Sequence, residues 1–426
     1  MLINNLYEIF LEYPVICTDS RNIIPDSIFF ALKGEHFDGN KYVKQVLNEG
    51  CAYAISDNKE NENIHGCIIV PNVLDALQQL ANYHRNELNT PIIAITGTNG
   101  KTTTKELLTA VLASKYKVVA TKGNLNNHIG VPLTLLSITK ETQIAVVEMG
   151  ANHIGEIAEL CRIAQPNAGL ITNIGKAHLE GFGSEEGVRQ TKGELYDFLN
   201  DNRGIIFYNN DDATLKKMAE NTEKAQHIPY GKTIYNAVLS NSDFLEFTTE
   251  IPVMTVKTHL VGSYNLNNAL AAIATGLHYE IPAEEIQNSL NNYIPANNRS
   301  QLIKTEHNTI IMDAYNANPS SMEAAIINFS NLNNSNKLLI LGDMLELGND
   351  SPAEHKNVIE LLKKYNLVKN AILIGNHFYE FKNPDSTFFQ SRADAATFLE
   401  NNKIHANTIL IKGSRGIGLE NLLKYL

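Results

Sequence analysis

Three features are scarce in this 426-residue chain, and each scarcity argues against a class of protein. The four cysteines show no CxxC spacing, which favours reduced thiols in the cytosol over a metal site. No segment approaches the ~18–20 uninterrupted apolar residues of a membrane span. The opening residues, MLINNLYEIFLEY, have no basic region and no small-residue cleavage site, so we expect no signal peptide. A cytoplasmic protein is therefore expected.

Positive charge is also scarce, with 35 basic against 46 acidic residues and a net charge of −11. A nucleic-acid backbone calls for a basic surface, so this balance argues against DNA or RNA as a general partner. A free nucleotide is still compatible, because it needs only a local basic site. The hydrophobic content of 43% is ample for packed cores, and the length predicts two or three domains of ~100–200 residues each.

The order of apolar segments predicts an α/β protein of three domains. Residues 1–85 mix short strands with a helix that starts near Asn72, which predicts a small mixed α/β domain. Residues 86–298 alternate apolar strands with helices, as in a parallel sheet covered on both faces. Within them, the stretch from about 230 to 260 alternates like antiparallel strands. Residues 299–426 repeat the strand–helix rhythm and predict a doubly wound, Rossmann-like domain.

The most informative segment is IIAITGTNGKTTTK at residues 92–105. A short β-branched strand runs into a glycine-containing turn and then into a helical pattern, the context in which backbone N–H groups bind phosphate. Lys101 would meet the β/γ-phosphates and Thr102 would offer its hydroxyl to Mg²⁺. The strict phosphate-loop pattern has glycine where this chain has Ile95, so the match is to a variant. An ordinary strand-to-helix turn is the alternative. The predicted nucleotide-binding residues here are Gly97, Thr98, Asn99, Gly100, Lys101, Thr102 and Thr103.

Polar residues follow two later strands, where ligands collect in open α/β sheets. Glu148 ends the strand IAVVE and could hold Mg²⁺, or it could simply be solvated. His178 follows AGLITNIG, and a histidine there is either a ligand or a satisfied polar residue. Lys192 stands at the start of an apparent helix in TKGELYDFL and, taken alone, reads as a surface lysine.

The third block opens with IIMDAYNANPSSMEAAI. Asp313 ends a strand, and Pro319 with its following serines suits a helix start. The intervening loop carries Tyr315, whose ring could stack on a nucleobase, and the amides of Asn316 and Asn318, which could hydrogen-bond one. A plain loop with Asx turns is the alternative.

Taken together, these motifs resemble the Mur ligases of bacterial peptidoglycan synthesis. The resemblance covers the whole chain. DSR and FFALKGEHFDGN look like the family's uridine-nucleotide domain, and the similar central segments are GTNGKTTTKE, GNLNNHIGVPLTLL, VEMGANHIGEIAEL, TNIGKAHLEGFGS and TKGEL. VGSYNLNNALAA, MDAYNANPSSM, LGDMLELG and IKGSRG resemble the later segments. Several long motifs in the same order make the resemblance specific.

The resemblance implies catalytic roles in the middle block. Lys192 matches a lysine that family members carry as a carbamate bridging toward Mg²⁺. Carbamylation turns a cation into a carboxylate-like anion, so a lysine can serve a metal. Glu148 matches a Mg²⁺ ligand and His178 a ligand of a second Mg²⁺, with Thr102 completing the metal set. The expected catalytic group is Lys101, Glu148, His178 and Lys192.

The resemblance also implies contacts to ATP from beyond the phosphate loop. Asn268 matches an asparagine that reaches the adenine side. Arg299 and Asp313 match an arginine and an aspartate that hold ATP from the hinge and the last domain. Asn316 and Asn318 match a loop at the nucleotide.

Four residues match the binding region of the UDP-sugar substrate: Ser20, Arg21, Asn126 and Asn127. One segment departs from the family pattern, because GxHN is replaced by Gly262-Ser263-Tyr264-Asn265. Tyrosine can still pack and donate one hydrogen bond at that position.

The activity implied is ATP-driven amide formation through an acyl phosphate. The segments DAYNANPSSM and LGDMLELG distinguish the member that adds D-alanyl-D-alanine to a UDP-linked tripeptide from sisters that add L-Ala, D-Glu or the third residue. Lys412, Ser414 and Arg415 are expected near that dipeptide. We expect ATP, two Mg²⁺ ions, small-molecule substrates and a monomer.

Two alternatives stay open. The nearer one is another amide ligase of the same superfamily, either the ligase that adds the third residue or folylpolyglutamate synthase. The more distant one is a nucleotide-binding switch without enzymatic activity. A switch has no use for His178, Lys192 and a uridine-type first domain together.

Overall fold

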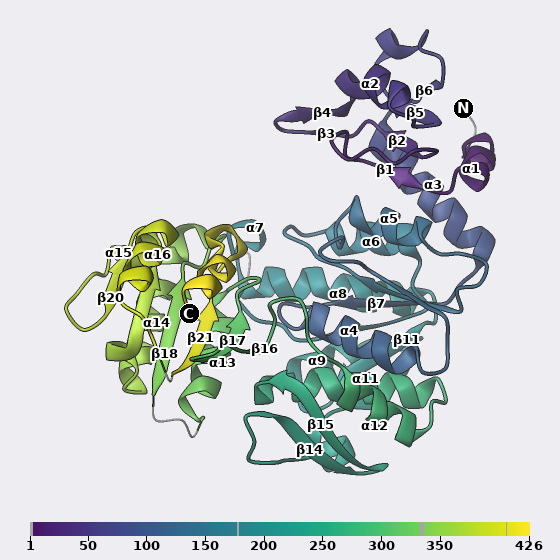
Figure 1. Cartoon of the computed structure of the whole chain (residues 1–426). Coiled ribbons are helices and arrows are strands. Elements are labelled where there is room, and N and C mark those ends of the chain that lie inside the picture. The colour runs from purple at the N-terminus through teal and green to yellow at the C-terminus, as the bar shows by residue number, and fades with distance from the viewer. Residues whose placement is uncertain (1–2, 177–178, 333–335, 406) are drawn as a thin grey trace.

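The first unit of the protein is a small parallel sheet with its own helices. The computed structural model describes residues 3–176, 179–332, 336–405 and 407–426, and its chain passes through three successive α/β units (Figure 1). The first sheet has the spatial order β1 (Ile16–Cys17), β2 (Ile28–Phe30), β5 (Tyr53–Ser56) and β6 (Cys67–Ile69), all parallel. Beside it lie α1 (Ile3–Glu12), α2 (Val43–Asn48) and the hairpin of β3 (Lys33–Gly34) and β4 (Phe37–Asp38).

A long helix, α3 (Val73–Leu88), leads from the first unit to the second. Its N-cap is Asn72, whose side chain accepts a hydrogen bond from the Asp75 amide, so the predicted helix start near Asn72 is confirmed. The helix ends at Asn89, which has a left-handed φ of 50°. In Figure 1, α3 runs from the first unit down to the central one.

The central unit is a six-stranded, fully parallel sheet, as the sequence predicts. Its spatial order is β12 (Gln226–Tyr230), β11 (Ile205–Asn209), β10 (Ala168–Ile171), β7 (Ile92–Thr96), β9 (Ile144–Glu148) and β8 (Val118–Ala120). Successive residues of β7 pack into opposite cores, with Ile92 and Ala94 on one side and Ile93 and Ile95 on the other. A strand buried on both faces explains why the sequence reads as an unbroken apolar run.

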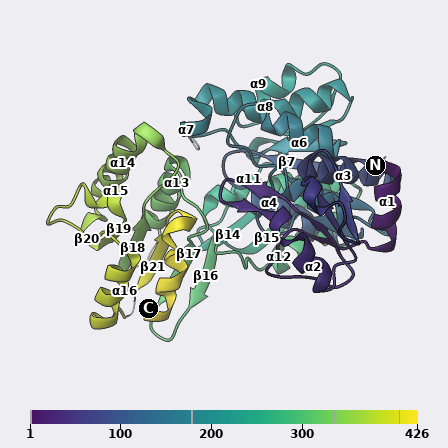
Figure 2. The same ribbon diagram turned by 90° about the horizontal axis from the view of Figure 1, so that it is seen from above.

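Helices cover both faces of this sheet (Figures 1 and 2). One core combines α3 with α5 (Gly130–Leu136), α6 (Glu156–Ala164), α8 (Glu185–Asp201) and α9 (Ala213–Glu220). The other combines α4 (Lys101–Leu112), α11 (Leu266–His278) and α12 (Ala283–Asn292). The short helices α7 (Leu179–Phe182) and α10 (Lys232–Tyr235) complete the unit. No helix in the described part of the chain is both long and apolar enough to cross a membrane.

The expected antiparallel stretch is confirmed as a ribbon of β13 (Val238–Leu239), β14 (Phe244–Glu250) and β15 (Val253–Val261). This ribbon continues into the sheet of the last unit, where β15 pairs antiparallel with β16 (Gln301–Lys304) at Leu260 and Gln301. The resulting sheet continues through β16, β17 (Thr309–Asp313), β21 (Thr408–Lys412), β18 (Lys337–Gly342), β19 (Ala371–Ile374) and β20 (Thr387–Phe389), and from β17 onward it is parallel.

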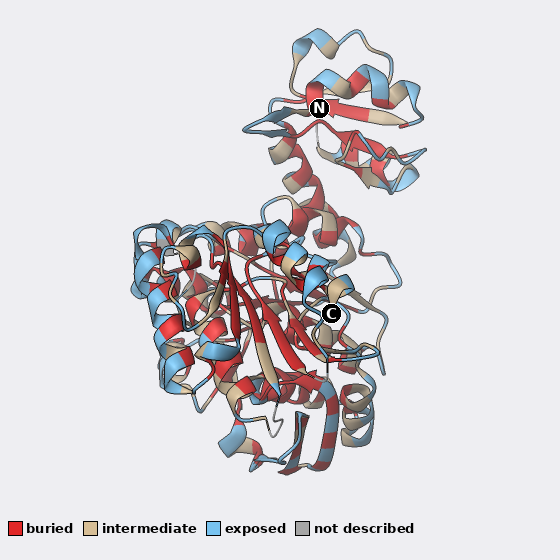
Figure 3. Cartoon of the chain, turned by 60° about the vertical axis from the view of Figure 1, so that its left-hand side comes forward, coloured by how far each residue is buried: buried red, intermediate tan, exposed pale blue. Residues whose placement is uncertain are grey.

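The last unit is doubly wound, as predicted. The helices α13 (Pro319–Ser330) and α14 (Ser351–Lys364) share a core with one face of the sheet, and α16 (Arg392–Asn401) packs on the other. Figure 3 shows its strands buried and its outer helical surfaces exposed. After β21 the chain ends in a 3₁₀ segment, η7 (Leu419–Tyr425), and not in an α-helix. The remaining short elements are α15 (Asn376–Tyr379), η1 (Gly39–Tyr42), η2 (Lys59–Asn61), η3 (Ser263–Asn265), η4 (Gly348–Asp350), η5 (Val368–Asn370) and η6 (Arg415–Ile417).

Candidate active site

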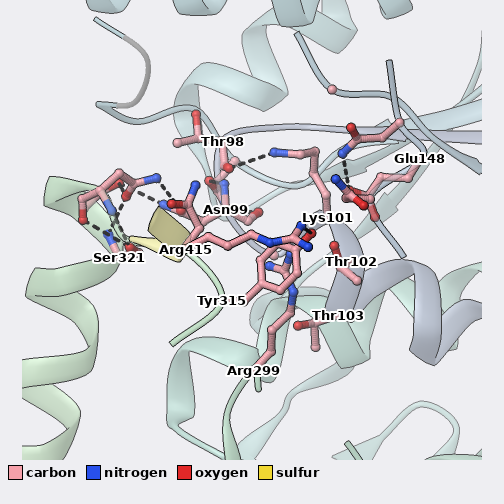
Figure 4. Close-up of a pocket in the computed structure, with 18 of the residues that line it drawn as sticks. Thr98, Asn99, Lys101, Thr102, Thr103, Glu148, Arg299, Tyr315, Ser321 and Arg415 are labelled. Carbon is pink, nitrogen blue, oxygen red and sulfur yellow. Dashed lines mark hydrogen bonds between the residues drawn. The ribbon is translucent and has the colours of Figure 1, made fainter. Parts of the chain in front are cut away.

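A cavity of about 660 Å³ lies where the central and last units meet. Its walls combine the turn after β7, the segment after β8, the ends of β9 and β10, the start of α11 and the loops that follow β17, β18 and β21. Figure 4 shows its side chains converging from both units. The predicted residues that line it are Thr98, Asn99, Gly100, Lys101, Thr102, Thr103, Asn126, Asn127, Glu148, Asn268, Arg299, Asp313, Tyr315, Asn316, Asn318, Lys412, Ser414 and Arg415.

The turn after β7 has the form that a phosphate loop requires. Gly97 and Gly100 have φ of 137° and 79°, a region that favours glycine, and α4 starts immediately after Gly100. A Cβ atom at Gly100 would lie 2.7 Å from Asn268 Oδ1, so the close approach of α11 also requires glycine. The amides at the start of α4 therefore face the cavity without an intervening side chain at position 100.

Lys101 lies over its own loop. Its Nζ donates to the carbonyl oxygens of Gly97 at 2.7 Å and Thr98 at 3.0 Å. Although part of its surface faces the cavity, the amine lies deep in the protein, and this burial lowers the pKa of Lys101 to about 8. Glu148 acts in the opposite direction. Carbonyl oxygens of its own loop therefore hold Lys101 Nζ in this structure.

Glu148 ends β9 and is 2% exposed. Its Oε1 accepts a hydrogen bond from Asn126 Nδ2 at 2.8 Å, and its amide donates to Thr121 Oγ1 at 2.9 Å. Its Oε2 is buried and has no hydrogen-bond partner among the described residues. A buried carboxylate oxygen without a partner is costly, and it suits a hard cation such as Mg²⁺.

One member of the predicted metal set lies outside the described residues. Residue 178, the predicted histidine ligand, lies outside the described residues. The described chain holds no group of three His, Cys, Asp or Glu side chains suited to a metal. That result is expected, because Glu148 is the one predicted ligand of those types within the described ranges.

Lys192 is placed differently from the sequence expectation. It lies in the middle of α8, not at its start, and it is 3% exposed rather than on the surface. Its Nζ lies 3.5 Å from the Ala151 carbonyl oxygen and 5.0 Å from the centre of the Phe182 ring. Burial, followed by repulsion from Lys101, lowers the pKa of Lys192 to about 7. The predicted start of α8 was wrong. The N-cap is Ser184, seven residues before the TKGEL motif.

The segment between α12 and β16 (residues 293–300), which we call the hinge, and the last unit together contribute five predicted residues in an unexpected arrangement. The Arg299 guanidinium carbon lies 3.8 Å from the centre of the Tyr315 ring, and Arg415 lies 5.3 Å from it on the same ring. Asp313 is not a free carboxylate, because Lys412 Nζ lies 2.6 Å from its Oδ2. The cation at position 412, expected near a dipeptide, is therefore engaged by Asp313.

The phosphate loop also touches the last unit directly. Asn318 is the N-cap of α13, and its Nδ2 donates to Asn99 Oδ1 at 2.8 Å. Asn99 Nδ2 in turn donates to Ser320 Oγ at 2.8 Å. Asn316 contributes its backbone oxygen to Lys412 Nζ at 3.4 Å. The expected helix start after Asn318 is confirmed by a full capping box with Ser321.

The predicted UDP-sugar residues fall into two groups. Asn126 and Asn127 line the cavity, and Asn127 Oδ1 also accepts from the amides at the start of α5. Ser20 and Arg21 lie in the first unit and do not line it. Ser20 is buried, whereas Arg21 is exposed and paired with Asp19 at 2.8 Å.

Asn173 was missed by the sequence reasoning. Its Oδ1 accepts from the Asn99 amide at 2.9 Å and its Nδ2 donates to the Asn99 carbonyl at 3.0 Å. It therefore braces the phosphate loop from the end of β10. The same signal that singled out Glu148, a polar residue just after a buried strand, could have found it.

Comparison with known proteins places this chain in a family. The family models for the Mur ligase catalytic domain, the Mur ligase middle domain and the Mur ligase glutamate ligase domain match residues 12–92, 95–276 and 298–415. A UDP-N-acetylmuramoyl-tripeptide–D-alanyl-D-alanine ligase of Bacillus subtilis is 36% identical, over 96% of this chain and 92% of the relative. The chain belongs to the Mur ligase family.

Solved Mur ligase structures share the whole architecture. MurF from Acinetobacter baumannii has a TM-score of 0.84 at 33% identity, covering 96% of this chain and 92% of that one. MurF ligase from Thermotoga maritima, solved in complex with ADP, has a TM-score of 0.85 at 26% identity and covers 97% of both chains. The three-domain Mur ligase fold predicted from the sequence is thereby confirmed.

Proposed function

We propose that this Mur ligase is an ATP-dependent peptide ligase that joins D-alanyl-D-alanine to the C-terminal carboxylate of UDP-N-acetylmuramoyl-tripeptide. The observation that carries this proposal is the 36% identity to the Bacillus subtilis ligase of that name along nearly the whole chain. The site geometry agrees with it, because one cavity joins the phosphate loop to the loops of the last unit. Small-molecule substrates suit a cavity of this size.

The reaction requires an activated acyl group, because a free carboxylate has no good leaving group. Transfer of the γ-phosphoryl group of ATP to the tripeptide carboxylate makes an acyl phosphate and releases ADP. The neutral amine of the dipeptide attacks the carbonyl carbon of the acyl phosphate. The C–O bond to phosphate breaks in the tetrahedral intermediate, and the nitrogen gives up one proton to solvent as the amide forms. Lys101 and the amides at the start of α4 would neutralise charge on the transferring group.

The proposal also names the residues that would bind Mg²⁺. Glu148, with its unpartnered Oε2, and the Thr102 hydroxyl would hold the cation, which would screen the phosphate oxygens. We assign His178 to a second Mg²⁺ through the family resemblance. Lys192 would serve as a carbamate: its neutral amine attacks CO₂, an N–C bond forms, and one proton leaves to solvent.

The other assignments concern where each substrate lies. We assign residues 1–85 to the UDP-sugar, with Ser20 and Arg21 near it, 86–298 to ATP, and 299–426 to the dipeptide side. Asn126 and Asn127 would meet the UDP-linked substrate within the cavity. Asn268, Arg299, Asp313, Asn316 and Asn318 would surround the nucleotide from α11, the hinge and the last unit. We also infer a monomer that acts in the cytoplasm.

The deciding experiment is phosphate release from the purified protein with ATP, Mg²⁺ and UDP-N-acetylmuramoyl-tripeptide, with and without D-alanyl-D-alanine. We expect release to depend on the dipeptide and a UDP-pentapeptide mass to appear. Comparing tripeptides that end in meso-diaminopimelate and L-lysine identifies the donor. Release with a free amino acid instead would point to a sister ligase or folylpolyglutamate synthase, and no substrate-dependent release would point to a nucleotide switch.

A further inference from the structure

Ser300, in the hinge before the last unit, is held in a strained conformation by its neighbours. Its φ is 49°, a left-handed value that serine rarely adopts, and its side chain is buried. Its Oγ accepts a hydrogen bond from Asn265 Nδ2 at 3.1 Å and pairs with the Tyr264 hydroxyl at 3.0 Å. A conformation of this kind persists only where the surroundings impose it.

From Ser300, hydrogen bonds lead back to the phosphate-loop helix. Asn265 Oδ1 accepts from Asn268 Nδ2 at 2.9 Å. Asn268 Oδ1 accepts from Thr104 Oγ1 at 3.1 Å. Thr104 is fully buried in α4, and Asn268 lies against Gly100 of the phosphate loop. The hinge is thus connected to the segment that would bind phosphate.

In the other direction, hydrogen bonds lead from Ser300 into the last unit. The Ser300 amide donates to Asp313 Oδ1 at 3.3 Å. Asp313 Oδ2 accepts from Lys412 Nζ, which also reaches the Asn316 carbonyl oxygen. Asp313 and Lys412 lie at the ends of β17 and β21, where the loops around the cavity begin. Their pairing therefore fixes where those loops stand relative to the hinge.

We propose that Ser300 is a positioning residue that couples the phosphate loop to the placement of the last unit. We call Thr104, Asn268, Asn265, Tyr264, Ser300 and Asp313 the hinge network. Ser300 acts through Asn265 and Asp313, so a shift of α4 or α11 on nucleotide binding reaches the cavity loops of the last unit. The proposal deepens the proposed function and rests on it. Tyr264, where the family pattern has His, supplies the hydroxyl that pairs with Ser300 in this chain.

Two glycine substitutions distinguish the effect of losing the hinge network from the effect of relieving backbone strain in the hinge. Ser300→Gly tolerates the left-handed φ and removes the hydroxyl. Asn298→Gly, at φ 52°, gives the same backbone freedom but lies outside the network and does not line the cavity. We expect Ser300→Gly to weaken ADP binding about three- to tenfold, the usual effect of losing a hydrogen bond. Asn298→Gly should leave ADP binding unchanged.

A double-mutant cycle tests the coupling itself. Thr104→Val keeps the shape of the side chain and removes the donor to Asn268. Because Thr104 and Ser300 share no contact, independent effects would multiply to within about twofold. We expect instead that Thr104→Val combined with Ser300→Gly binds ADP no more weakly than the worse single variant. Combined with Asn298→Gly, Thr104→Val should show only its own effect.

The cycle is read out in two ways, so that this inference and the proposed function can fail separately. Calorimetric titration with ADP needs no ligase activity, and dipeptide-dependent phosphate release measures turnover. If the native protein released no phosphate with the dipeptide, the proposed function would fail while the ADP cycle still decided the coupling. Multiplicative losses in ADP binding, or equal effects of Ser300→Gly and Asn298→Gly, would overturn the inference. Melting temperatures of all variants show whether each one folds.

Discussion

Asn318 Nδ2 donates to Asn99 Oδ1 at 2.8 Å, and this bond joins the last unit to the phosphate loop across 219 residues of sequence. The same Asn318 side chain accepts from the Ser321 amide and so caps α13. One residue therefore starts a helix and contacts the loop that would hold ATP. This bond and the one from Asn99 Nδ2 to Ser320 Oγ hold the start of α13 against the nucleotide site.

Replacing Asn318 by serine should separate these two roles. Serine caps helices about as well as asparagine but is too short to reach Asn99. We expect the melting temperature to change little and kcat/KM for dipeptide-dependent phosphate release to fall about three- to tenfold, as for one lost hydrogen bond. The matched control is Ser391→Asn at the cap of α16, a residue that does not line the cavity. Equal losses in both variants would contradict the prediction.

Replacing Lys101 by alanine should remove activity. Its ammonium group is the cation of the phosphate loop, and the loss of one strong electrostatic stabiliser lowers turnover ~10²–10³-fold. The measurement is phosphate release with saturating substrates. Lys140→Ala, an exposed lysine away from the cavity, serves as the control and should turn over normally. Near-normal turnover by the Lys101 variant would remove it from the catalytic group.

Glu148→Gln should weaken Mg²⁺ binding and leave the fold intact. The variant keeps the size of the side chain and removes the negative charge that Oε1 and the unpartnered Oε2 share. We expect Mg²⁺ to raise the melting temperature of the native protein with ADP, and this rise to be lost in the variant. Glu141→Gln, an exposed residue paired with Lys117, is the control. An unchanged Mg²⁺ effect would show that Glu148 is not a ligand.

Carbamylation of Lys192 can be detected directly. Protein equilibrated with ¹³C-labelled bicarbonate should show a carbamate carbon signal in its NMR spectrum, and Lys192→Gln should lack it. Activity lost in bicarbonate-free buffer should return on adding bicarbonate to the native protein only. Lys105→Gln would be a poor control, because that amine is buried against Thr121 O at 2.6 Å. Lys217→Gln on the neighbouring helix α9 is preferable. A signal that persists without Lys192 would contradict the prediction.

The fold should lose stability in mild acid because the buried His355 resists protonation. It is fully buried, its Nε2 accepts from the Met344 amide, and burial lowers the pKa of His355 below its ordinary value of 6.5. Asp343 opposes this shift in pKa and His377 adds to it. Between the lowered pKa and 6.5 the unfolded chain binds more protons than the folded one, so stability is complete above pH 6.5 and declines below it.

The measurement is the melting temperature between pH 7.5 and 5.5. We expect a smaller decline in His355→Gln than in the native protein, because the titrating group is gone. His36→Gln, an exposed histidine of the first unit, should keep the native slope. A native-like slope in the His355 variant would contradict the assignment.

A feature could be predicted from the sequence when the residues that determine it are neighbours in the chain. The phosphate loop could be read from residues 92–105 because strand, glycines and helix are contiguous there. Taken alone, Lys192 reads as a surface residue, because nothing nearby in sequence reveals that α8 packs its middle against the central sheet; only the family resemblance assigned it to the metal site. The pairing of Asp313 with Lys412 joins residues 99 positions apart, and only the parallel register of β17 and β21 brings them together.

The sequence by itself determined the fold class and most of the elements, because hydrophobic period, glycine positions and cap residues act within a few neighbouring residues. It also carried the motifs that indicate the family. Only the tertiary structure decided which polar atoms meet. Asn99 with Asn318 and Asn265 with Ser300 are brought within hydrogen-bond distance by the packing of the last unit on the central one. Packing depends on side chains distant in sequence, so no local pattern specifies these pairs.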